Sequence, residues 1–459
     1  MTSSGKAIRV DVASLIDERP VSTLQVRVFV FCALVAVLDG VDSQAIAVAG
    51  PLIRTQLGIS AVTFAWAFSA GLFGAAIGAI LFGPIADRIG RKPTLVSATA
   101  LFGIFTCLTA LATDFSTLLL YRSIAGLGLG GAIPCFITLA AEYAPTRRRA
   151  MFTSLLWAGY PLGNAVGGFM SSFVITHFDW PAVFYAGGVP TLVVALLLLF
   201  LVPESVRFLA SRGINGSRTE RLIRALDPTL PAGPIEASHV EEAPSRTKIP
   251  LADLFTNGRA AGTVLLGSIL FLAFATTTVI VLQVPTLLRE ANVPLQVSAI
   301  LTGVYSIVAV FGMAIAGRLV EKFGSVAALA PAFVCGAGLL AALGYFASSP
   351  FAAAIVMALL GVTVPLGASG GIALTANFYP TAMRSAGTGW AMGMGRVGQV
   401  CSPLIIGLLL ALAWAPVHIF TAMATAPLLA GLCVVLQNSL ARGATQPGPE
   451  RLAARNPAE

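Results

Sequence analysis

The chain has 459 residues, of which 57% are hydrophobic and 10% charged, and its mean hydropathy is +0.87. A soluble globular protein has about 25% charged residues, so this composition excludes a water-soluble enzyme and indicates an all-α protein that crosses a membrane many times. The pI of about 9.5 and the net charge of +8 do not indicate nucleic-acid binding. The reason is that Lys and Arg lie in short loops between apolar segments and form no basic patch.

Twelve apolar segments of helical length follow one another along the chain. A membrane-spanning helix needs about 20 apolar residues, and one polar stretch separates the first six segments from the last six. The segments start near Val26, Phe64, Pro93, Ser116, Met151, Trp180, Ala261, Val297, Val326, Phe351, Ser385 and Trp414. We therefore predict an N-terminal tail (1–25), a six-helix bundle (26–203), a linker (204–258) with a short amphipathic helix near Arg218–Leu226, a second six-helix bundle (259–440) and a C-terminal tail (441–459).

The positions of the basic residues predict the orientation. Of the 28 Lys and Arg residues, 24 lie in the tails, the linker and the loops on one side, and only Arg54 and Arg289 lie on the other side. Cytoplasmic loops of membrane proteins are rich in Lys and Arg. We therefore expect a multi-pass protein of a bacterial inner membrane, with both termini and the linker in the cytoplasm.

The two halves repeat one another. The pattern Gly-x-x-x-acid-base-apolar-Gly occurs at 83–90 and again 234 residues later at 317–324, and Gly163-Asn164 matches Gly398-Gln399 at an offset of 235. Two similar six-helix halves are typical of transporters that alternate between two conformations around a central site.

The segment Gly83-Pro-Ile-Ala-Asp-Arg-Ile-Gly-Arg-Lys-Pro-Thr-Leu95 is the strongest local motif. It predicts a tight turn in which the glycines allow a close approach or a positive φ, and in which Asp87 accepts hydrogen bonds from helix N-terminal amides or from the following basic residues. A charge cluster of this kind can act as a gate, and the alternative is a basic loop that only fixes orientation. The predicted gating residues are Gly83, Asp87, Arg88, Gly90, Arg91 and Lys92, with Arg384 in the matching place of the second half.

This segment resembles the loop between the second and third helices of the major facilitator superfamily, and Arg122-Ser-Ile-Ala-Gly126-Leu-Gly-Leu-Gly130 resembles its fourth-helix motif. The resemblance covers about residues 25 to 440 and implies twelve helices in two pseudo-symmetric bundles. Within it, Asp39-Gly-Val-Asp42 and Gly395-Arg396-Val-Gly398 resemble the first and eleventh helices of the aromatic acid:proton symporter family. Ser325 departs from the pattern, because it replaces the basic residue after the second-half glycine, so we expect a weaker gate there.

Asp39 and Asp42 are candidates for proton coupling on their own chemistry. The i, i+3 spacing places both carboxylates on one helix face, and ionisable residues at membrane depth are functional candidates by default. Burial and mutual repulsion favour the protonated form of one of them, so the pair can carry a proton. Arg122 cannot lose its own proton, and the resemblance implies that it couples to Asp39 or Asp42. Glu142 is a further candidate, which either pairs with Arg147–Arg149 or assists the gate, and the alternative is a solvated charge at a helix end.

Arg396 is the best candidate for holding a substrate. It lies in an apolar, glycine-rich segment, and a guanidinium binds a carboxylate through two parallel hydrogen bonds. The alternative is a pair with the aspartates of the first half. An aromatic substrate also needs stacking faces and a few polar groups. The further predicted substrate-binding residues are Asp42, Asn164, Gln399, Trp157, Tyr160 and Tyr305.

These features predict a proton-coupled symporter that imports a small aromatic carboxylate, such as a benzoate or hydroxybenzoate, by alternating access. The alternatives are a transporter of another organic anion, an exporter of drugs or metabolites, and a membrane sensor. We expect no enzymatic activity, no metal and no other cofactor, because the chain has neither metal-ligand spacing nor a phosphate-binding loop. The expected partners are the aromatic acid, protons and the lipid bilayer, without nucleic acid, and we expect the protein to function as a monomer.

Overall fold

The computed structural model describes residues 8–212, 214, 217–227, 230, 235–238, 251–256, 258–380 and 383–445. The first residues of the predicted N-terminal tail, parts of the linker and the C-terminal tail from residue 446 onward lie outside this range. The short helix predicted near Arg218–Leu226 is confirmed as α9 (Ser217–Leu226).

The first six apolar segments form six long helices, which start within three residues of the predicted positions. These helices are α2 (Thr23–Leu57), α3 (Ala61–Ile89), α4 (Arg91–Thr109), α5 (Phe115–Tyr143), α6 (Arg149–His177) and α7 (Trp180–Leu201), with one 3₁₀ turn, η1 (Thr146–Arg148), before α6. Hydroxyl and carboxylate caps set several starts. Ser22 and Asp114 each form a capping box, with Gln25 and Thr117 respectively.

The second half repeats this plan with more breaks in its helices. Its elements are η2 (Leu251–Phe255), α10 (Ala260–Thr278), the π-helical turn η3 (Val279–Gln283), α11 (Val284–Glu290), α12 (Leu295–Phe323), α13 (Ser325–Phe346), α14 (Pro350–Phe378), α15 (Arg384–Ala411), α16 (Pro416–Met423) and α17 (Thr425–Thr445). Among the described residues, 11 helical stretches are long and apolar enough to cross a membrane. The 29-residue α6 takes the place of the fifth predicted segment, so the prediction of twelve long helices is confirmed.

The two halves turn in the same way between corresponding helices. Gly90 alone separates α3 from α4 and has a φ of 112°, while Gly324 alone separates α12 from α13 and has a φ of 82°. A positive φ favours glycine because it has no Cβ atom. The turn role predicted for Gly90 is therefore confirmed. Gly83 differs, because it lies inside α3 and a Cβ atom built on it would meet nothing within 4 Å.

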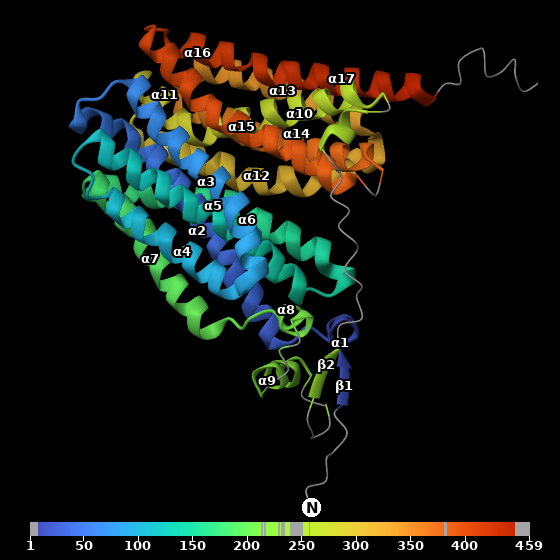
Figure 1. Ribbon diagram of the computed structural model, residues 1–459. Coiled ribbons are helices and arrows are strands. Elements are labelled where there is room, and N and C mark those ends of the chain that lie inside the picture. The colour runs from blue at the N-terminus through green and yellow to red at the C-terminus, as the bar shows by residue number, and fades with distance from the viewer. Residues whose placement is uncertain are drawn as a thin grey trace, which may run out of the picture. The chain divides into compact units, whose positions relative to one another are not determined.

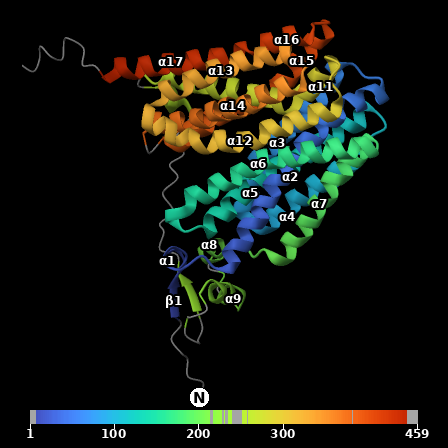
Figure 2. The ribbon, with the colours of Figure 1, turned by 180° about the vertical axis from the view of Figure 1, so that it is seen from behind.

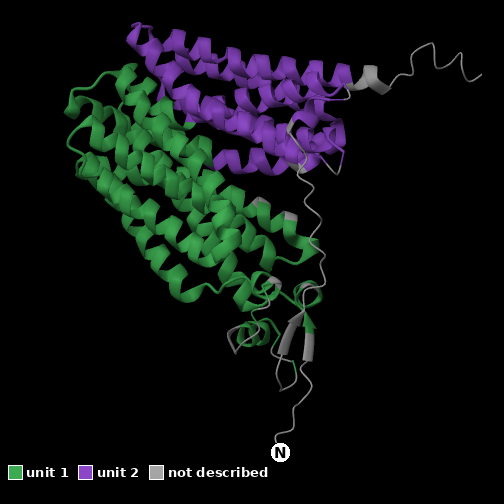
Figure 3. Ribbon diagram, in the orientation of Figure 1, with its two compact units in different colours: residues 1–247, 281–306 green, residues 248–280, 307–459 purple. Residues whose placement is uncertain are grey.

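The chain divides into two compact units (Figure 3). Unit 1 contains residues 1–247 together with 281–306, and unit 2 contains residues 248–280 and 307–459. Unit 1 therefore holds the first six long helices and also α11 with the first part of α12. Arg396 belongs to unit 2, whereas Asp39, Asp42 and Arg122 belong to unit 1.

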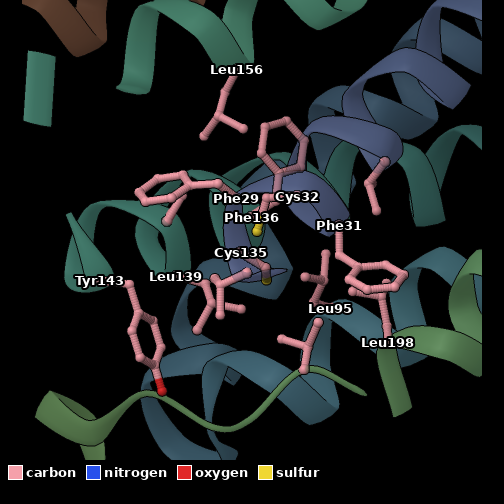
Figure 4. Packing of buried hydrophobic residues seen from close by; sticks show 14 of the residues in the cluster. Phe29, Phe31, Cys32, Leu95, Cys135, Phe136, Leu139, Tyr143, Leu156 and Leu198 are labelled. Atoms are coloured by element: carbon pink, nitrogen blue, oxygen red, sulfur yellow. The ribbon is translucent and has the colours of Figure 1, made fainter. Parts of the chain in front are cut away.

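Glycines and buried apolar side chains hold the helices of unit 1 together. A Cβ atom on Gly126 of α5 would overlap the main chain of Gly71 in α3, so the two helices touch backbone to backbone there. This confirms the close approach expected from the glycines after Arg122. Further along α5, Cys135 and Phe136 pack against Cys32 of α2 in the buried cluster (Figure 4).

A small group of short elements covers one end of unit 1. It comprises β1 (Ile8–Asp11), α1 (Val12–Glu18), α8 (Val206–Ser211), α9 and β2 (Ile235–Ser238), and both views show them together below the long helices (Figures 1 and 2). The strands β1 and β2 pair in parallel, with Ile8 opposite Ile235. Asp17 of α1 accepts hydrogen bonds from the hydroxyl and main-chain N–H of Thr146 at 2.6 Å each, which ties the N-terminal segment to the turn before α6.

Candidate functional site

A buried ion pair joins α2 to α5 in the interior of unit 1. Arg122 donates two parallel hydrogen bonds to Asp42, from Nη1 to Oδ1 at 2.9 Å and from Nη2 to Oδ2 at 2.8 Å. Asp42 is 1% exposed and Arg122 is 6% exposed. Two parallel charge-assisted bonds are the strong form of this interaction, and a pair so far from solvent is expensive unless both partners are held in place.

The same carboxylate receives a third hydrogen bond, from α4. The hydroxyl of Thr106, which is fully buried, donates to Oδ1 of Asp42 at 2.9 Å. Sequence reasoning missed Thr106, because one threonine in an apolar helix has no local signal. Oδ1 of Asp42 therefore accepts from both a guanidinium and a neutral hydroxyl, while Oδ2 accepts from the guanidinium.

Asp39 lies one helical turn before Asp42 on α2 and is also buried. The sequence left open which of the two aspartates meets Arg122. The structure pairs Arg122 with Asp42, and the two carboxylates share α2 at the predicted i, i+3 spacing.

A second charge cluster forms around Arg91 at the end of the bundle where α3 turns into α4. The Arg91 guanidinium lies 3.1 Å from Asp87 Oδ1 and 3.1 Å from Glu142 Oε1, and it also donates to the carbonyl of Ala86. The expected pair between Asp87 and Arg91 is present. The carboxylate of Glu142 pairs with Arg91 of the predicted gating segment and not with Arg147–Arg149, because α5 directs its end toward α4. The alternative that Glu142 assists the gate stays a prediction.

A cavity with a volume of about 330 Å³ adjoins this cluster. Charged side chains from α3, α4 and α5 line it together with small and neutral residues. The lining residues are Gly83, Ala86, Asp87, Arg91, Pro134, Thr138 and Glu142. The predicted gating segment thus faces an open space in unit 1.

Glu204, the first residue of the predicted linker, completes this cluster. Its Oε1 accepts hydrogen bonds from the main-chain N–H groups of Arg91 at 3.0 Å and Lys92 at 3.2 Å. These are orphan donors at the start of α4, where Gly90 supplies no side-chain cap. The amides were expected to bind Asp87. The carboxylate that caps them instead comes from the chain directly after α7.

The other predicted gating residues have smaller roles in the structure. Arg88 is exposed, and its carbonyl lies near the guanidinium of Arg212, which also donates to the carbonyl of Asp87 at 2.8 Å. Lys92 contributes its main-chain N–H to the bond with Glu204. Arg384 is the exposed first residue of α15 in unit 2.

Arg396 lies in the middle of α15 and is half-buried. Its Nη1 donates to Oε1 of Gln399 at 3.0 Å, one turn further along the same helix. A Cβ atom on the preceding Gly395 would lie 2.7 Å from the ring of Phe274 in α10. In unit 2, α15 therefore carries a cation and an amide one turn apart, and an aromatic ring of α10 packs beside the residue that precedes the cation.

The remaining predicted substrate residues belong to unit 1. Asn164 of α6 is 1% exposed and its Oδ1 has no hydrogen-bond partner among the described residues. A Cβ atom on Gly40 of α2 would lie 2.6 Å from the main-chain N of Asn164, so the two helices touch beside Asp39. Trp157 and Tyr160 are half-buried on α6, and Tyr305 on α12 is 2% exposed.

At the opposite end of unit 1 from the Arg91 cluster, α2 and α6 pack against α11 and α12. Gln44 donates to the hydroxyl of Thr302 at 2.8 Å, and Arg54 pairs with Glu290 at 3.1 Å. Between these contacts lies an apolar cluster of Val48, Leu52, Ile175, Leu295 and Ala299. We call the Gln44–Thr302 and Arg54–Glu290 contacts the polar seam. Neither contact was predicted, because the two partners of each are more than 200 residues apart in the chain.

Comparison with known proteins now decides the family. The sequence profile of the Major Facilitator Superfamily matches residues 32–267 and again residues 264–457. The chain belongs to the major facilitator superfamily. The resemblance inferred from the motifs is confirmed, and so is the fold of two six-helix halves.

The major facilitator fold also appears in comparisons of structure. The crystal structure of the D-xylose-proton symporter superposes with a TM-score of 0.71 at 18% identity, covering 90% of this chain and 97% of that chain. An inward-open structure of the xylose transporter XylE from Escherichia coli gives a TM-score of 0.69 at 17% identity, with 89% and 95% covered.

The sequence relatives of this major facilitator protein are transporters. The gallate transporter of Pseudomonas putida is 31% identical over 94% of this chain and 96% of its own length, and the 4-hydroxybenzoate transporter PcaK of Acinetobacter baylyi is 33% identical over 88% and 89%. The benzoate transport protein of Acinetobacter baylyi is 28% identical over 96% and 95%. The chain is therefore a membrane transporter and not an enzyme.

Proposed function

We propose that this protein is a proton-coupled symporter that imports a small aromatic carboxylate across a bacterial inner membrane by alternating access. Three transporters of gallate, 4-hydroxybenzoate and benzoate resemble it over most of their length. The distribution of Lys and Arg favours cytoplasmic termini, which places the Arg91 cluster on the cytoplasmic side and the polar seam on the periplasmic side.

The observation that best supports proton coupling is the buried ion pair between Asp42 and Arg122. Its two hydrogen bonds satisfy a carboxylate that is almost fully buried. A buried carboxylate must be neutralised by a cation or by a proton. Protonation of Asp42 therefore weakens its hold on Arg122, and a conformational change that separates the pair changes how firmly the proton is held. Asp39, one turn earlier, is the second member of the proton site.

Arg396 supplies the means of holding an anionic substrate. A planar guanidinium matches a carboxylate, Gln399 orients it through the bond at 3.0 Å, and Phe274 beside Gly395 offers an aromatic face for a ring. An exporter of lipophilic cations is disfavoured, because two cations repel each other in a low-dielectric site.

The two ends of unit 1 are suited to gating. In an alternating-access cycle the polar seam and the Arg91 cluster separate and reform in turn. Both rest on ion pairs and hydrogen bonds, which can break and reform at little cost when water enters. We propose that Asp87, Arg91, Glu142 and Glu204 hold the cytoplasmic end and that Gln44, Arg54, Glu290 and Thr302 hold the periplasmic end.

Uptake into proteoliposomes tests this function. The purified protein is reconstituted, a pH gradient with an alkaline interior is imposed, and uptake of labelled benzoate, 4-hydroxybenzoate and gallate is measured with and without an uncoupler. We expect accumulation of at least one acid that the uncoupler abolishes. Uptake that does not depend on the pH gradient would exclude proton coupling. Absence of flux with all three acids would exclude small aromatic carboxylates as the substrate class. Acid-stimulated loss of preloaded substrate would indicate export.

Variants of Arg396 test the substrate site separately. Arg396→Ala is expected to reduce uptake by at least a hundredfold while membrane abundance stays near the wild-type level, because truncating one partner of a desolvated charge pair costs about 3 kcal/mol or more. Arg396→Lys keeps the charge but not the paired donors, and we expect an intermediate loss. Unchanged uptake by Arg396→Ala would exclude this residue from the site.

A further inference from the structure

Thr106 is the least expected member of the group around Asp42. The default partner of a buried threonine hydroxyl in a helix is a carbonyl four residues earlier. Thr109 on the same helix does this, with a bond to the carbonyl of Phe105 at 2.8 Å, and so does Thr191 with Gly187. Thr106 instead donates across to another helix, to Oδ1 of Asp42 at 2.9 Å. The Thr106 hydroxyl therefore donates to the Asp42 carboxylate on α2 and not to a carbonyl of its own helix.

The chemistry of the two partners of Asp42 differs. A guanidinium can only donate hydrogen bonds, whereas a hydroxyl can donate and accept. Arg122 can therefore bind the carboxylate form of Asp42 but cannot accept a bond from the protonated form. Of Arg122 and Thr106, only Thr106 can accept a hydrogen bond from the protonated form as well as donate to the carboxylate. Its bond is to Oδ1, the oxygen that also accepts from Arg122 Nη1.

We propose that Thr106 is a positioning residue for the transported proton. It donates to the Asp42 carboxylate, and when a proton from solution forms an O–H bond at Oδ1, the Thr106 hydroxyl rotates to accept from it and keeps its own proton. The proton is then held on the Thr106 side of Asp42 while Arg122 is released. This inference rests on the proposed proton-coupled function and assigns a residue to it.

Few other groups near Asp42 carry charge. Arg122 faces it from α5, and Asp39 lies one turn away on α2. The packed face of α6 brings the neutral Asn164 against Gly40, and α7 brings Gly187 against Val41. In the described part of unit 1, the pH dependence assigned to this site therefore depends on the two aspartates, with Arg122 as a fixed positive charge.

The test compares variants of Thr106 in proteoliposomes, with Thr99→Val as the matched control. Thr99 is also a fully buried threonine of α4, and its hydroxyl has no hydrogen-bond partner among the described residues. Two quantities are measured: the pH at which gradient-driven uptake is half-maximal, and counterflow exchange at saturating substrate, which needs no net proton release.

For Thr106→Val we expect the half-maximal pH of uptake to rise by about 0.7 unit, because a hydrogen bond to a charged group is worth more than one to a neutral group by about 1 kcal/mol. Counterflow should stay within about twofold of the wild type. Thr106→Ser keeps the hydroxyl and should retain the wild-type profile, as should Thr99→Val. If Thr106→Val is absent from the membrane, Thr106→Ala replaces it, since Ala and Ser both lack the methyl group and differ only in the hydroxyl.

The outcomes separate this inference from the function on which it rests. If the wild type shows no proton-driven uptake, the proposed function fails. If the wild type is proton-driven and Thr106→Val or Thr106→Ala keeps its pH profile, only the role of Thr106 fails. An equal shift in Thr106→Ser and Thr106→Ala would show that packing and not the hydroxyl matters, which would also overturn the inference.

Discussion

Glu204 caps the helix that begins with Arg91. Its carboxylate Oε1 accepts the main-chain N–H of Arg91 at 3.0 Å, and it stands beside Gly90, the residue whose positive φ makes the turn. A Cβ atom at Gly90 would overlap the Glu204 carboxylate. The glycine in the loop motif is thus required twice, once for its backbone conformation and once to leave room for the cap.

Removing this cap should destabilise the protein. We expect Glu204→Ala to lower the free energy of unfolding by about 1 kcal/mol, since loss of a helix cap typically costs that much, and Glu204→Gln to cost about half as much because one acceptor oxygen remains. Thermal unfolding of the detergent-purified variants measures the change in Tm. Glu220→Ala is the control, because its partly exposed i, i+4 pair with Arg224 contributes little. Equal Tm values for Glu204→Ala and Glu220→Ala would contradict the capping role.

The guanidinium geometry of Arg91 should matter for transport. Arg91 bridges Asp87, Glu142 and the carbonyl of Ala86, and its guanidinium lies 4.9 Å from the centre of the Phe208 ring. Lysine cannot make these contacts together. We expect Arg91→Lys to reduce the uptake rate by roughly tenfold, which corresponds to the loss of about one charge-assisted hydrogen bond.

Arg88→Lys is the matched control for Arg91→Lys. Arg88 belongs to the same motif and carries the same charge, but its side chain is exposed, so its uptake should stay near the wild-type rate. Initial rates normalised to membrane abundance give the comparison. If both variants lose uptake equally, the loss does not come from the specific bonds of Arg91, and the prediction fails.

Much of the architecture could be predicted from the sequence because it depends on local properties. Apolar length predicted the helices, Gly90 and Gly324 marked the turns, and the glycines after Arg122 predicted its close contact with α3. The ionisable residues at membrane depth were also visible, because so few of them occur in apolar segments.

The partners of these residues could not be predicted, because they depend on how the helices are rotated against one another. The sequence could not choose between Asp39 and Asp42 for Arg122, and it left open whether Glu142 meets Arg147–Arg149 or the gating segment that holds Arg91. Thr106 had no local signal at all. Glu204 had a weak one, since a carboxylate next to a serine directly after an apolar segment can cap a neighbouring helix as well as belong to a linker.

Charge reversal across the polar seam tests whether it gates transport. Arg54 and Glu290 form a partly exposed ion pair at 3.1 Å, and pairs of this kind contribute about 0.2–1 kcal/mol. Arg54→Glu places two carboxylates together, and we expect the uptake rate to fall up to about fivefold at low salt because the closed seam is less stable. The double variant Arg54→Glu with Glu290→Arg should recover most of the rate.

Raising the salt concentration provides the check on this prediction. Screening weakens exposed charge interactions, so the difference between Arg54→Glu and the wild type should shrink at high ionic strength. A double variant that is no better than Arg54→Glu alone would show that the pairing of these side chains is irrelevant to transport.

The contact between Asp17 and Thr146 should respond to acid in one direction. Burial raises the pKa of Asp17, but the hydrogen bonds from Thr146 outweigh this, aided by the nearby Arg207 and Arg149, so the pKa lies below the usual value of 3.8. A carboxyl with a lowered pKa stabilises the folded state above its unfolded pKa, and this contribution disappears as the pH falls through the folded pKa.

Hydrogen exchange of the α1 amides, corrected for intrinsic rates, measures this contribution of Asp17. At pH 7 we expect exchange about fivefold faster in Asp17→Asn than in the wild type, since roughly 1 kcal/mol of hydrogen bonding is lost. The difference should shrink as the pH falls below about 3.8 and through the lowered folded pKa, because the wild-type carboxyl then becomes protonated as well. A difference that persisted unchanged as the pH fell well below the folded pKa would show that the charge of Asp17 does not hold α1 against the turn before α6.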